Sequence, residues 1–237
     1  MQKIERKHHD DRQILAHRAL FALVIASQGA GLAATNAHAE HDTFFVRFRG
    51  IAVVPQDDST AVFADGVTPI AGSSVSVTDD YKPELDITYK FAPHWGVELI
   101  AGVSNHQVNA EGSIAGLGEV IDTCVLPPTL TLQYHFNPHG TLRPYVGAGV
   151  NYTNFFDEEV RGPLYQPGAR VDVENSWGYA LQAGVDYEFA ERWFINADIK
   201  YLDIDTRAEF VGTTAGNLAV DVDIDPVVFG LGVGYRF

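Results

Sequence analysis

The feature that most constrains this chain is an alternation of apolar and polar residues that dominates everything after Glu40. Within residues 193–201, for example, Trp193, Ile195 and Ala197 alternate with Asn196 and Asp198. Successive side chains of a strand point to opposite faces of a sheet, so a period of two predicts strands rather than helices. The predicted strands are residues 44–54, 85–91, 95–103, 130–136, 146–152, 177–189, 193–201 and 227–237.

The connections between these eight segments alternate in length. Short turns are expected at residues 92–94, 137–142 and 190–192. Long loops are expected at residues 55–83, 104–128, 154–174 and 203–226. An antiparallel up-and-down meander whose two ends face different compartments produces this alternation.

The polar faces of the predicted strands indicate which solvent surrounds them. Five cationic and five anionic residues would make a very costly core for a soluble sandwich, but they suit the lining of a membrane barrel. These residues are Arg47, Arg49, Asp86, Lys90, Glu98, Asp186, Glu188, Asp198, Lys200 and Arg236. The opposite faces carry Leu, Val and Ile, with aromatic residues near the strand ends, as at membrane interfaces. The sequence therefore predicts an all-β fold, an eight-stranded antiparallel up-and-down transmembrane β-barrel.

The first 39 residues have the pattern of a secretory signal peptide, which leaves residues 40–237 as one outer-membrane β-barrel domain. Five basic residues precede the apolar run 19–26, and the stretch ends in Ala37-His38-Ala39. The apolar run is too short to span a bilayer, which needs roughly 20 residues. The single cysteine, Cys124, excludes a disulfide scaffold, and a formal net charge of −15 disfavours binding to nucleic acid.

Several stretches resemble the outer membrane protein W (OmpW) family of Gram-negative bacteria. They are Leu126-Pro-Pro-Thr-Leu130, Arg143-Pro-Tyr-Val-Gly-Ala-Gly-Val-Asn-Tyr152, Phe155-Phe-Asp157, Asn175-Ser-Trp-Gly178, Gln182-Ala-Gly-Val-Asp-Tyr187, Tyr201-Leu-Asp-Ile-Asp-Thr206 and Gly234-Tyr-Arg-Phe237. The resemblance implies an outer-membrane barrel with periplasmic termini that admits small hydrophobic molecules. The terminal Phe237 would then be the signal recognised by the barrel-assembly machinery.

The charged interior argues against diffusion straight through the barrel. An eight-stranded barrel is just wide enough for its own side chains, so the lumen charges are expected to form a plug. An apolar ligand that enters from outside would then leave sideways into the bilayer. Pro127 and Pro128 mark a candidate lateral gap, because proline donates no hydrogen bond to a sheet. The alternative is that the two prolines only end a long loop.

The candidate ligand path comprises Ile100, Tyr145, Phe156 and Lys200, with Val67 and Ile70 from the loops. By the family resemblance, Ile100 and Lys200 match an apolar pair that constricts the path, and Lys200 departs from that pattern. Lys200 could pair with Asp198 or Glu98, or attract an amphipathic anion such as a fatty acid. For Ile100, plain interior packing is the alternative.

The loop at 203–226 carries recurring carboxylates: Asp203, Asp205, Asp221, Asp223 and Asp225. Oxygen ligands suit Ca²⁺ or Mg²⁺, but a solvated acidic rim is the favoured interpretation, with no built metal site. Such a rim could still bind divalent ions that bridge lipopolysaccharide. No cofactor is expected.

Catalysis is not expected, because neither His106 nor His135 has a nucleophile at a telling spacing. Two functions remain. One is passage of small hydrophobic or amphipathic molecules, and the other is a structural or interaction barrel that binds surfaces, phage or bacteriocins.

Overall fold

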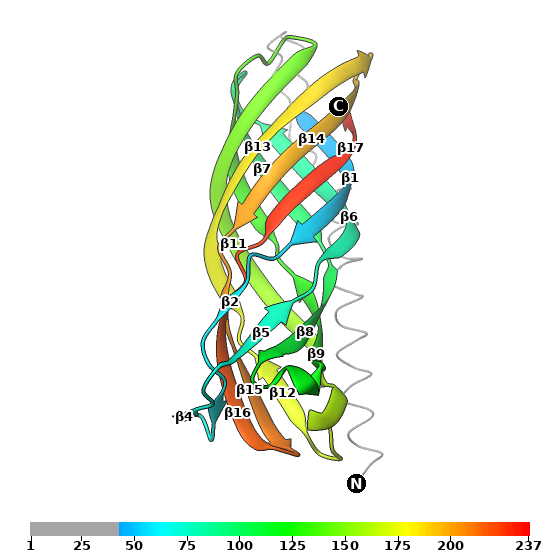
Figure 1. Ribbon diagram of the computed structural model, residues 1–237. Helices are drawn as coiled ribbons and strands as arrows, with labels where there is room; N and C mark the ends of the chain where they lie inside the picture. Colours follow the sequence, from blue (N-terminus) through cyan, green and yellow to red (C-terminus); the bar gives the residue numbers. More distant parts are fainter. Residues whose placement is uncertain (1–42) are drawn as a thin grey trace, which may run out of the picture. The chain divides into compact units, whose positions relative to one another are not determined.

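The computed structural model describes residues 43–237, so the predicted signal peptide lies outside the described residues. Eight antiparallel strands form a closed barrel, in which each strand pairs with two neighbours and β10 pairs with β11 to complete the ring (Figure 1). The barrel strands are β1 (Phe44–Val54), β6 (Asp80–Lys90), β7 (Trp95–Gly102), β10 (Thr129–His135), β11 (Leu142–Val160), β13 (Ser176–Ala190), β14 (Trp193–Leu202) and β17 (Val227–Arg236). The predicted fold class is confirmed.

The outer face of the barrel is apolar and its inner face is polar. In β10, Leu130 and Leu132 are exposed on the outside, whereas Thr131 and Gln133 are fully buried inside. Aromatic rings pack against one another on the outside near the strand ends, as for Trp193 and Tyr235 with ring centroids 5.0 Å apart. An exterior of this kind is stable only against lipid. Among the described residues, no helix has both the length and the apolar character needed to cross a membrane.

The four long connections contain regular β-structure, which corrects the prediction that they are loops. They contain β2 (Asp58–Ser59), β3 (Phe63–Ala64), β4 (Thr68–Pro69), β5 (Ser73–Val77), β8 (Ser104–Gly112), β9 (Glu119–Leu126), β12 (Arg170–Val173), β15 (Asp205–Thr213) and β16 (Gly216–Asp223), with short 3₁₀ turns at Ala115–Leu117 and Gly162–Leu164. The physical reason is that alternation continues into them, as in Ile121 to Val125 and Val171 to Val173.

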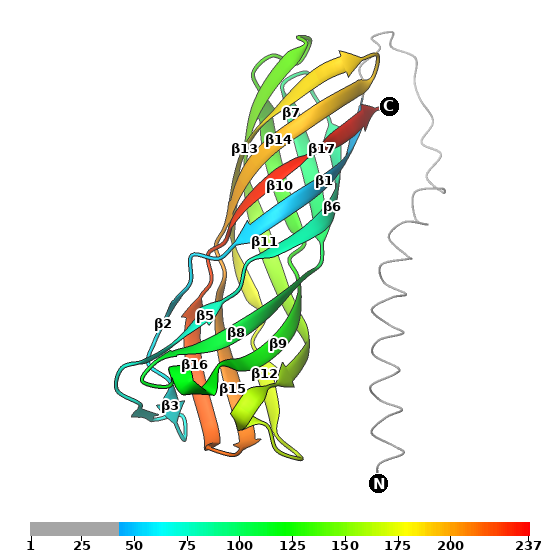
Figure 2. The same ribbon diagram turned by 45° about the vertical axis from the view of Figure 1, so that its right-hand side comes forward.

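These strands form a further region of β-structure at one end of the barrel. We call this region the loop half. β9 pairs with the far end of the long strand β11, and β8 and β5 follow in the same sheet. The strands β12, β15, β16, β3 and β4 form a separate sheet. Figure 2 shows both sheets at the end of the barrel opposite the short turns, and we call that opposite end the turn end.

The two prolines lie where one antiparallel ladder is interrupted. β7 and β10 pair as far as Ile100 with Thr129, and pairing resumes between β8 and β9 at Ser104 with Val125. The register is the same on both sides of the interruption. Residues 101–103 and 126–128 therefore face each other, and no residue pair joins them in the described part of the chain. The other edge of the segment 126–128 faces β11. There the Tyr152 amide donates to the Pro128 carbonyl over 3.1 Å, so the contact with β11 persists.

Candidate functional site

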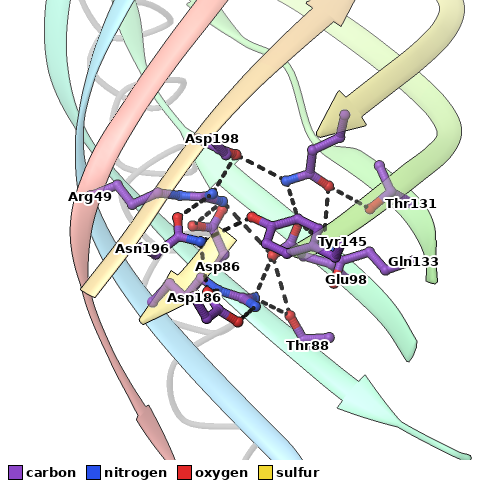
Figure 3. Close-up of polar contacts among 12 residues, drawn as sticks. Arg49, Asp86, Thr88, Glu98, Thr131, Gln133, Tyr145, Asp186, Asn196 and Asp198 are labelled. Atoms are coloured by element: carbon purple, nitrogen blue, oxygen red, sulfur yellow. Dashed lines mark hydrogen bonds and ion pairs between the residues drawn. The ribbon is translucent and has the colours of Figure 1, made fainter. Parts of the chain in front are cut away.

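A buried ion-pair network fills the middle of the barrel, and Arg47 of β1 lies at its centre. Its Nη1 contacts Glu98 Oε1 at 2.8 Å and Thr88 Oγ1 at 2.6 Å, and its Nη2 contacts Asp186 at 2.8 Å. Arg47, Thr88 and Glu98 are fully buried, and Asp186 is almost so. Figure 3 shows side chains from strands around the barrel converging on this cluster.

Arg49 extends the network toward the loop half. Its Nη2 lies 2.5 Å from Asp86, its Nε lies 3.2 Å from Glu84, and its Nη1 pairs with Asp198. Glutamine amides link the carboxylates: Gln133 donates to Glu98 over 2.7 Å, and Gln182 donates to Glu98 and Asp198 over 2.9 and 3.0 Å (Figure 3). Charge-assisted bonds in a dry interior are strong, and breaking them leaves buried charge unpaired.

Lys200 marks the loop-half end of this network. It pairs with Glu84 and lies 3.5 Å from Asp198. The central network, from Arg47 to Lys200, therefore contains three cationic and five anionic side chains, a formal net charge of −2.

A second ionic cluster lies toward the turn end, where Glu188 pairs with Arg143 and Arg236. Lys90 differs from the expected plug residues: it donates to the Pro93 carbonyl over 2.6 Å, and its Nζ lies 5.5 Å from the Phe45 ring centroid. Because Lys90 is at the last position of β6, its long side chain reaches the neighbouring turn. The other nine charged residues predicted for the lumen all take part in ion pairs there.

Tyr145 belongs to the plug and not to a ligand path in the upper barrel. Its hydroxyl accepts a bond from Asn196 over 3.0 Å, and its ring lies 5.2 Å from the Arg47 guanidinium. The rings of Phe45 and Phe194 lie 5.7 and 5.4 Å from the same guanidinium. Tyr145 is the fourth residue of β11, close to the turn end, which places it on the far side of the network from the loop half.

Above the network lies an apolar cavity, surrounded by the upper barrel and the loop half. Its volume is about 1160 Å³, counting space open to solvent. Most of its lining is Val, Ile, Leu, Ala or Phe, contributed by strands as distant in sequence as β1 and β16. Ile100, Glu84 and Lys200 lie at its contact with the central network. A lining of this apolar character suits a small apolar molecule.

The predicted path residues divide between this cavity and other places. Ile100 and Lys200 line the cavity, whereas Phe156 does not, and the neighbouring Phe155 takes that position. The alternation along β11 explains the correction, because inward residues continue from Tyr145 through Asn151 to Phe155. Val67 is 76% exposed, and Ile70 packs against the apolar core of the loop half.

Pro127 lines the cavity at the point where the ladder is interrupted, together with Gly102 and Val103 from the facing chain. The cavity therefore reaches the barrel wall at residues 101–103 and 126–128. Pro128 precedes Thr129, the first residue of β10.

Sequence reasoning missed Glu84, Gln133, Gln182, Asn196 and Arg143, all of which contribute to the lumen network. Glu84 and Arg143 lie just outside the predicted strand limits, and extending the alternation outward would have found them. Gln133, Gln182 and Asn196 lie on the predicted polar faces, but the prediction of the lumen residues considered only charged side chains.

The acidic residues gather in part at the base of β15. The carboxylates of Asp203, Asp205 and Asp225 lie within 4.8 Å of one another. Asp225 already accepts bonds from the Tyr201 hydroxyl and the Ile204 amide, at 2.6 and 3.0 Å. Binding of divalent ions that bridge lipopolysaccharide at this rim stays a prediction.

The remaining reactive groups show no catalytic arrangement among the described residues. The two ring nitrogens of His106 lie 2.7 Å from the Thr78 carbonyl and 3.0 Å from Ser104 Oγ, and burial lowers its pKa. Burial raises the pKa of the Cys124 thiol, which disfavours the reactive thiolate.

A closed eight-stranded barrel with a lipid-compatible exterior and an ion-paired interior defines a class, the transmembrane barrels of the outer membrane. Within that class the chain belongs to the OmpW family, whose family model matches residues 40–237. It is 37% identical to outer membrane protein W of Vibrio cholerae, over 85% of this chain and 91% of that protein.

Two further comparisons agree with this assignment. The crystal structure of OprG from Pseudomonas aeruginosa superposes with a TM-score of 0.77 and 39% identity, covering 82% of this chain and 95% of that one. The dibenzothiophene metabolism operon protein PahQ of Pseudomonas aeruginosa is 29% identical, over 79% of this chain and 86% of that protein. These relatives place the chain in the outer membrane of Gram-negative bacteria.

Proposed function

We propose that this barrel passes small hydrophobic or amphipathic molecules from outside the cell into the outer membrane by lateral exit. The observation that carries the proposal is the apolar cavity of the loop half, which rests on a closed charge network and reaches the wall beside Pro127. The name of the relative PahQ, which refers to dibenzothiophene metabolism, supports an apolar aromatic compound as one substrate.

The central network supports a sideways route, because it opposes passage along the barrel axis. A ligand moving from the cavity toward the turn end would have to separate Arg49 from Asp86 and Arg47 from Asp186, pairs that are almost wholly buried. Separating buried pairs costs about 3–5 kcal/mol each, and an apolar ligand offers no replacement bonds.

The interrupted ladder supports an exit between residues 101–103 and 126–128. A transmembrane barrel normally satisfies every backbone group within its wall, so a three-residue interruption is an unusual place in it. Because Pro127 and Pro128 lack an N–H, neither of them adds an unsatisfied donor at this place. Pro127 and Val103, which line the cavity at this place, are themselves apolar.

The first test of transport compares uptake of a labelled alkane or dibenzothiophene in a knockout strain and in the same strain complemented with this protein. Faster uptake in the complemented strain supports the proposal, and equal rates would refute it.

The exit is tested by replacing Pro127 with Thr and Pro128 with Val, so that both positions can pair with the facing residues of β7. We expect uptake to fall at least about fivefold, with the barrel still folded. The matched control is Pro226→Thr, because Pro226 also lines the cavity and precedes a barrel strand, β17. Unchanged uptake in the double variant would rule out this exit but not transport itself.

The alternative function is that of a structural or interaction barrel, which binds surfaces, phage or bacteriocins without transport. It was expected to have loops packed directly onto the charged plug, whereas the loop half surrounds a cavity. Contacts with lipopolysaccharide, and recognition of Phe237 by the assembly machinery, remain proposals.

A further inference from the structure

The cavity meets the central network at a surface that we call the cavity floor. The anionic and cationic side chains there differ in how far they are already paired. Of the described residues that line the cavity, only Glu84, His106 and Lys200 have ionisable side chains. Glu84 and Lys200 are both nearly buried, at 5% and 3% exposure, so their charges act in a poorly screened environment.

Lys200 is already committed to two carboxylates. It pairs with Glu84, and its Nζ lies 3.5 Å from Asp198. Directly beneath the floor, the central network as a whole has a formal charge of −2. A carboxylate brought to the floor would therefore compete with Glu84 and Asp198 for Lys200, beside a network in which carboxyl groups outnumber cationic side chains.

Unlike Lys200, Glu84 can still take part in a further hydrogen bond, as an acceptor. The contacts with Arg49 Nε and with Lys200 both use its Oε1 atom. Neither uses Oε2, and the residue lines the cavity. An ionised carboxylate has about four lone-pair sites, so it can accept further bonds from a donor in the cavity.

His106 cannot supply a compensating positive charge. Its ring is held between the Thr78 carbonyl and Ser104 Oγ, at 2.7 and 3.0 Å. Burial lowers the pKa of this ring below its ordinary value, which disfavours the charged imidazolium.

The hydroxyls that line the cavity are also occupied as donors. Thr129 donates to the Pro127 carbonyl over 3.0 Å, and Thr153 donates to Asn151 Oδ1 over 2.7 Å. Thr206 donates to the Glu174 carbonyl over 2.6 Å. The lining thus offers acceptors to a ligand but few free donors.

We propose that the cavity selects amphipaths whose polar end donates hydrogen bonds, such as alcohols and protonated amines, and rejects those that end in a carboxylate. The polar end contacts Glu84, and the hydrocarbon part lies among the Val, Ile and Leu side chains above it. This inference rests on the proposed function, since it names the class of molecule that the same cavity takes.

The test measures equilibrium binding of radiolabelled 1-octanol, octylamine and octanoate to the protein in zwitterionic lipid nanodiscs at neutral pH. Binding to empty nanodiscs is subtracted. Because the three probes share one alkyl chain, differences between them report the polar end. We expect saturable binding of octanol and octylamine, and octanoate weaker by at least about tenfold, or about 1.4 kcal/mol.

Two variants assign the selection to Glu84. In Glu84→Gln the floor loses one negative charge, so octanoate is expected to approach octanol in affinity while octylamine weakens. The matched control is Glu188→Gln, which removes the same charge from the cluster at the turn end and should leave the probe order unchanged. Folding of each variant is checked by its heat-sensitive electrophoretic mobility.

The outcomes separate the two proposals. If all three probes bind equally to the unmodified protein, the selection is wrong although the cavity binds apolar ligands. If none binds saturably, both the selection and the proposed function are wrong. The probe series on the unmodified protein decides this even if Glu84→Gln does not fold.

Discussion

Arg47 is the single side chain on which most of the central network depends. It contacts Glu98, Thr88 and Asp186, and three aromatic rings surround its guanidinium. Replacing it by Met takes the nearest cation from two buried carboxylates, Glu98 and Asp186, and Glu98 keeps only the more distant Arg49 at 3.8 Å. We expect Arg47→Met to lower the free energy of unfolding by about 3–5 kcal/mol, measured by denaturant titration in lipid vesicles with tryptophan fluorescence.

The control for this prediction is Arg161→Met in the loop half. Arg161 is likewise paired with carboxylates, in this case three, but its side chain is 44% exposed. Exposed pairs contribute little, so the change should stay within about 0.5 kcal/mol. Equal losses in the two variants would show that burial of the network is not what makes it strong.

Asp205 makes stability of the β15–β16 hairpin depend on pH. Burial, together with Asp223, Asp203 and Asp225, raises the pKa of Asp205 above its usual value. The folded hairpin therefore keeps a proton in a pH range where the unfolded chain has lost it. Its stability is full below the ordinary carboxyl pKa of about 3.9 and falls as pH rises through the raised value.

Asp205→Asn should remove this dependence. At neutral pH we expect slower amide hydrogen exchange in β15 and β16, by an amount worth about 0.2–1 kcal/mol after solvent screening, and no difference at low pH. Glu111→Gln removes the same charge from another strand of the loop half, β8, and should have no such effect. A stabilisation by Asp205→Asn that is equal at both pH values would contradict the electrostatic explanation.

Individual residues show where sequence reasoning succeeds. Alternation alone placed Arg47, Arg49 and Glu98 inside the barrel, because a strand has a fixed period of two. It could not show that Lys200 pairs with Glu84, since that contact depends on how far the strands are staggered around the barrel. Phe156 is a different case: the alternation pointed to Phe155.

Among the elements, the β15–β16 hairpin covers the cavity. Ala208 and Phe210 of β15 and Val220 of β16 all line it. Joining Arg207 directly to Asp221 through an Asn-Gly turn would remove these side chains and keep the pairing below them, because those two residues are partners. We expect binding of 1-octanol to weaken at least about tenfold, or about 1.4 kcal/mol, in the nanodisc assay, with the barrel intact.

Val67→Ser is the control for the shortened hairpin, because Val67 is an apolar residue of the loop half that lies outside the cavity. Its octanol binding should equal that of the unmodified protein. Retained binding in the shortened protein would mean that the cavity does not need this cover.

The elements also show a limit of sequence reasoning. The eight barrel strands were predictable because each carries a long alternation with a lipid face. Strands such as β12 and β15 were missed, because apolar residues that alternate over a few positions are common in irregular segments as well.

At the scale of the whole molecule, two ionic clusters obstruct the lumen. The central network and the cluster around Glu188 lie in series along the barrel, with Arg143 and Glu188 near the turn end of their strands. We expect liposomes that contain this protein to swell in arabinose no faster than protein-free liposomes, while a general porin in parallel gives fast swelling. Arabinose influx above the protein-free rate would mean that a hydrated path passes both clusters.

The matching register on the two sides of the proline interruption has a further consequence. The β7–β10 pair and the β8–β9 pair have the same register. Residues 101–103 and 126–128 can therefore approach or separate without a shift of one strand along another. An exit at this place would need no large movement of the barrel, and its width would be set by the side chains at six positions. Such an opening acts as a size filter, in which release slows with the girth of the ligand rather than with its length.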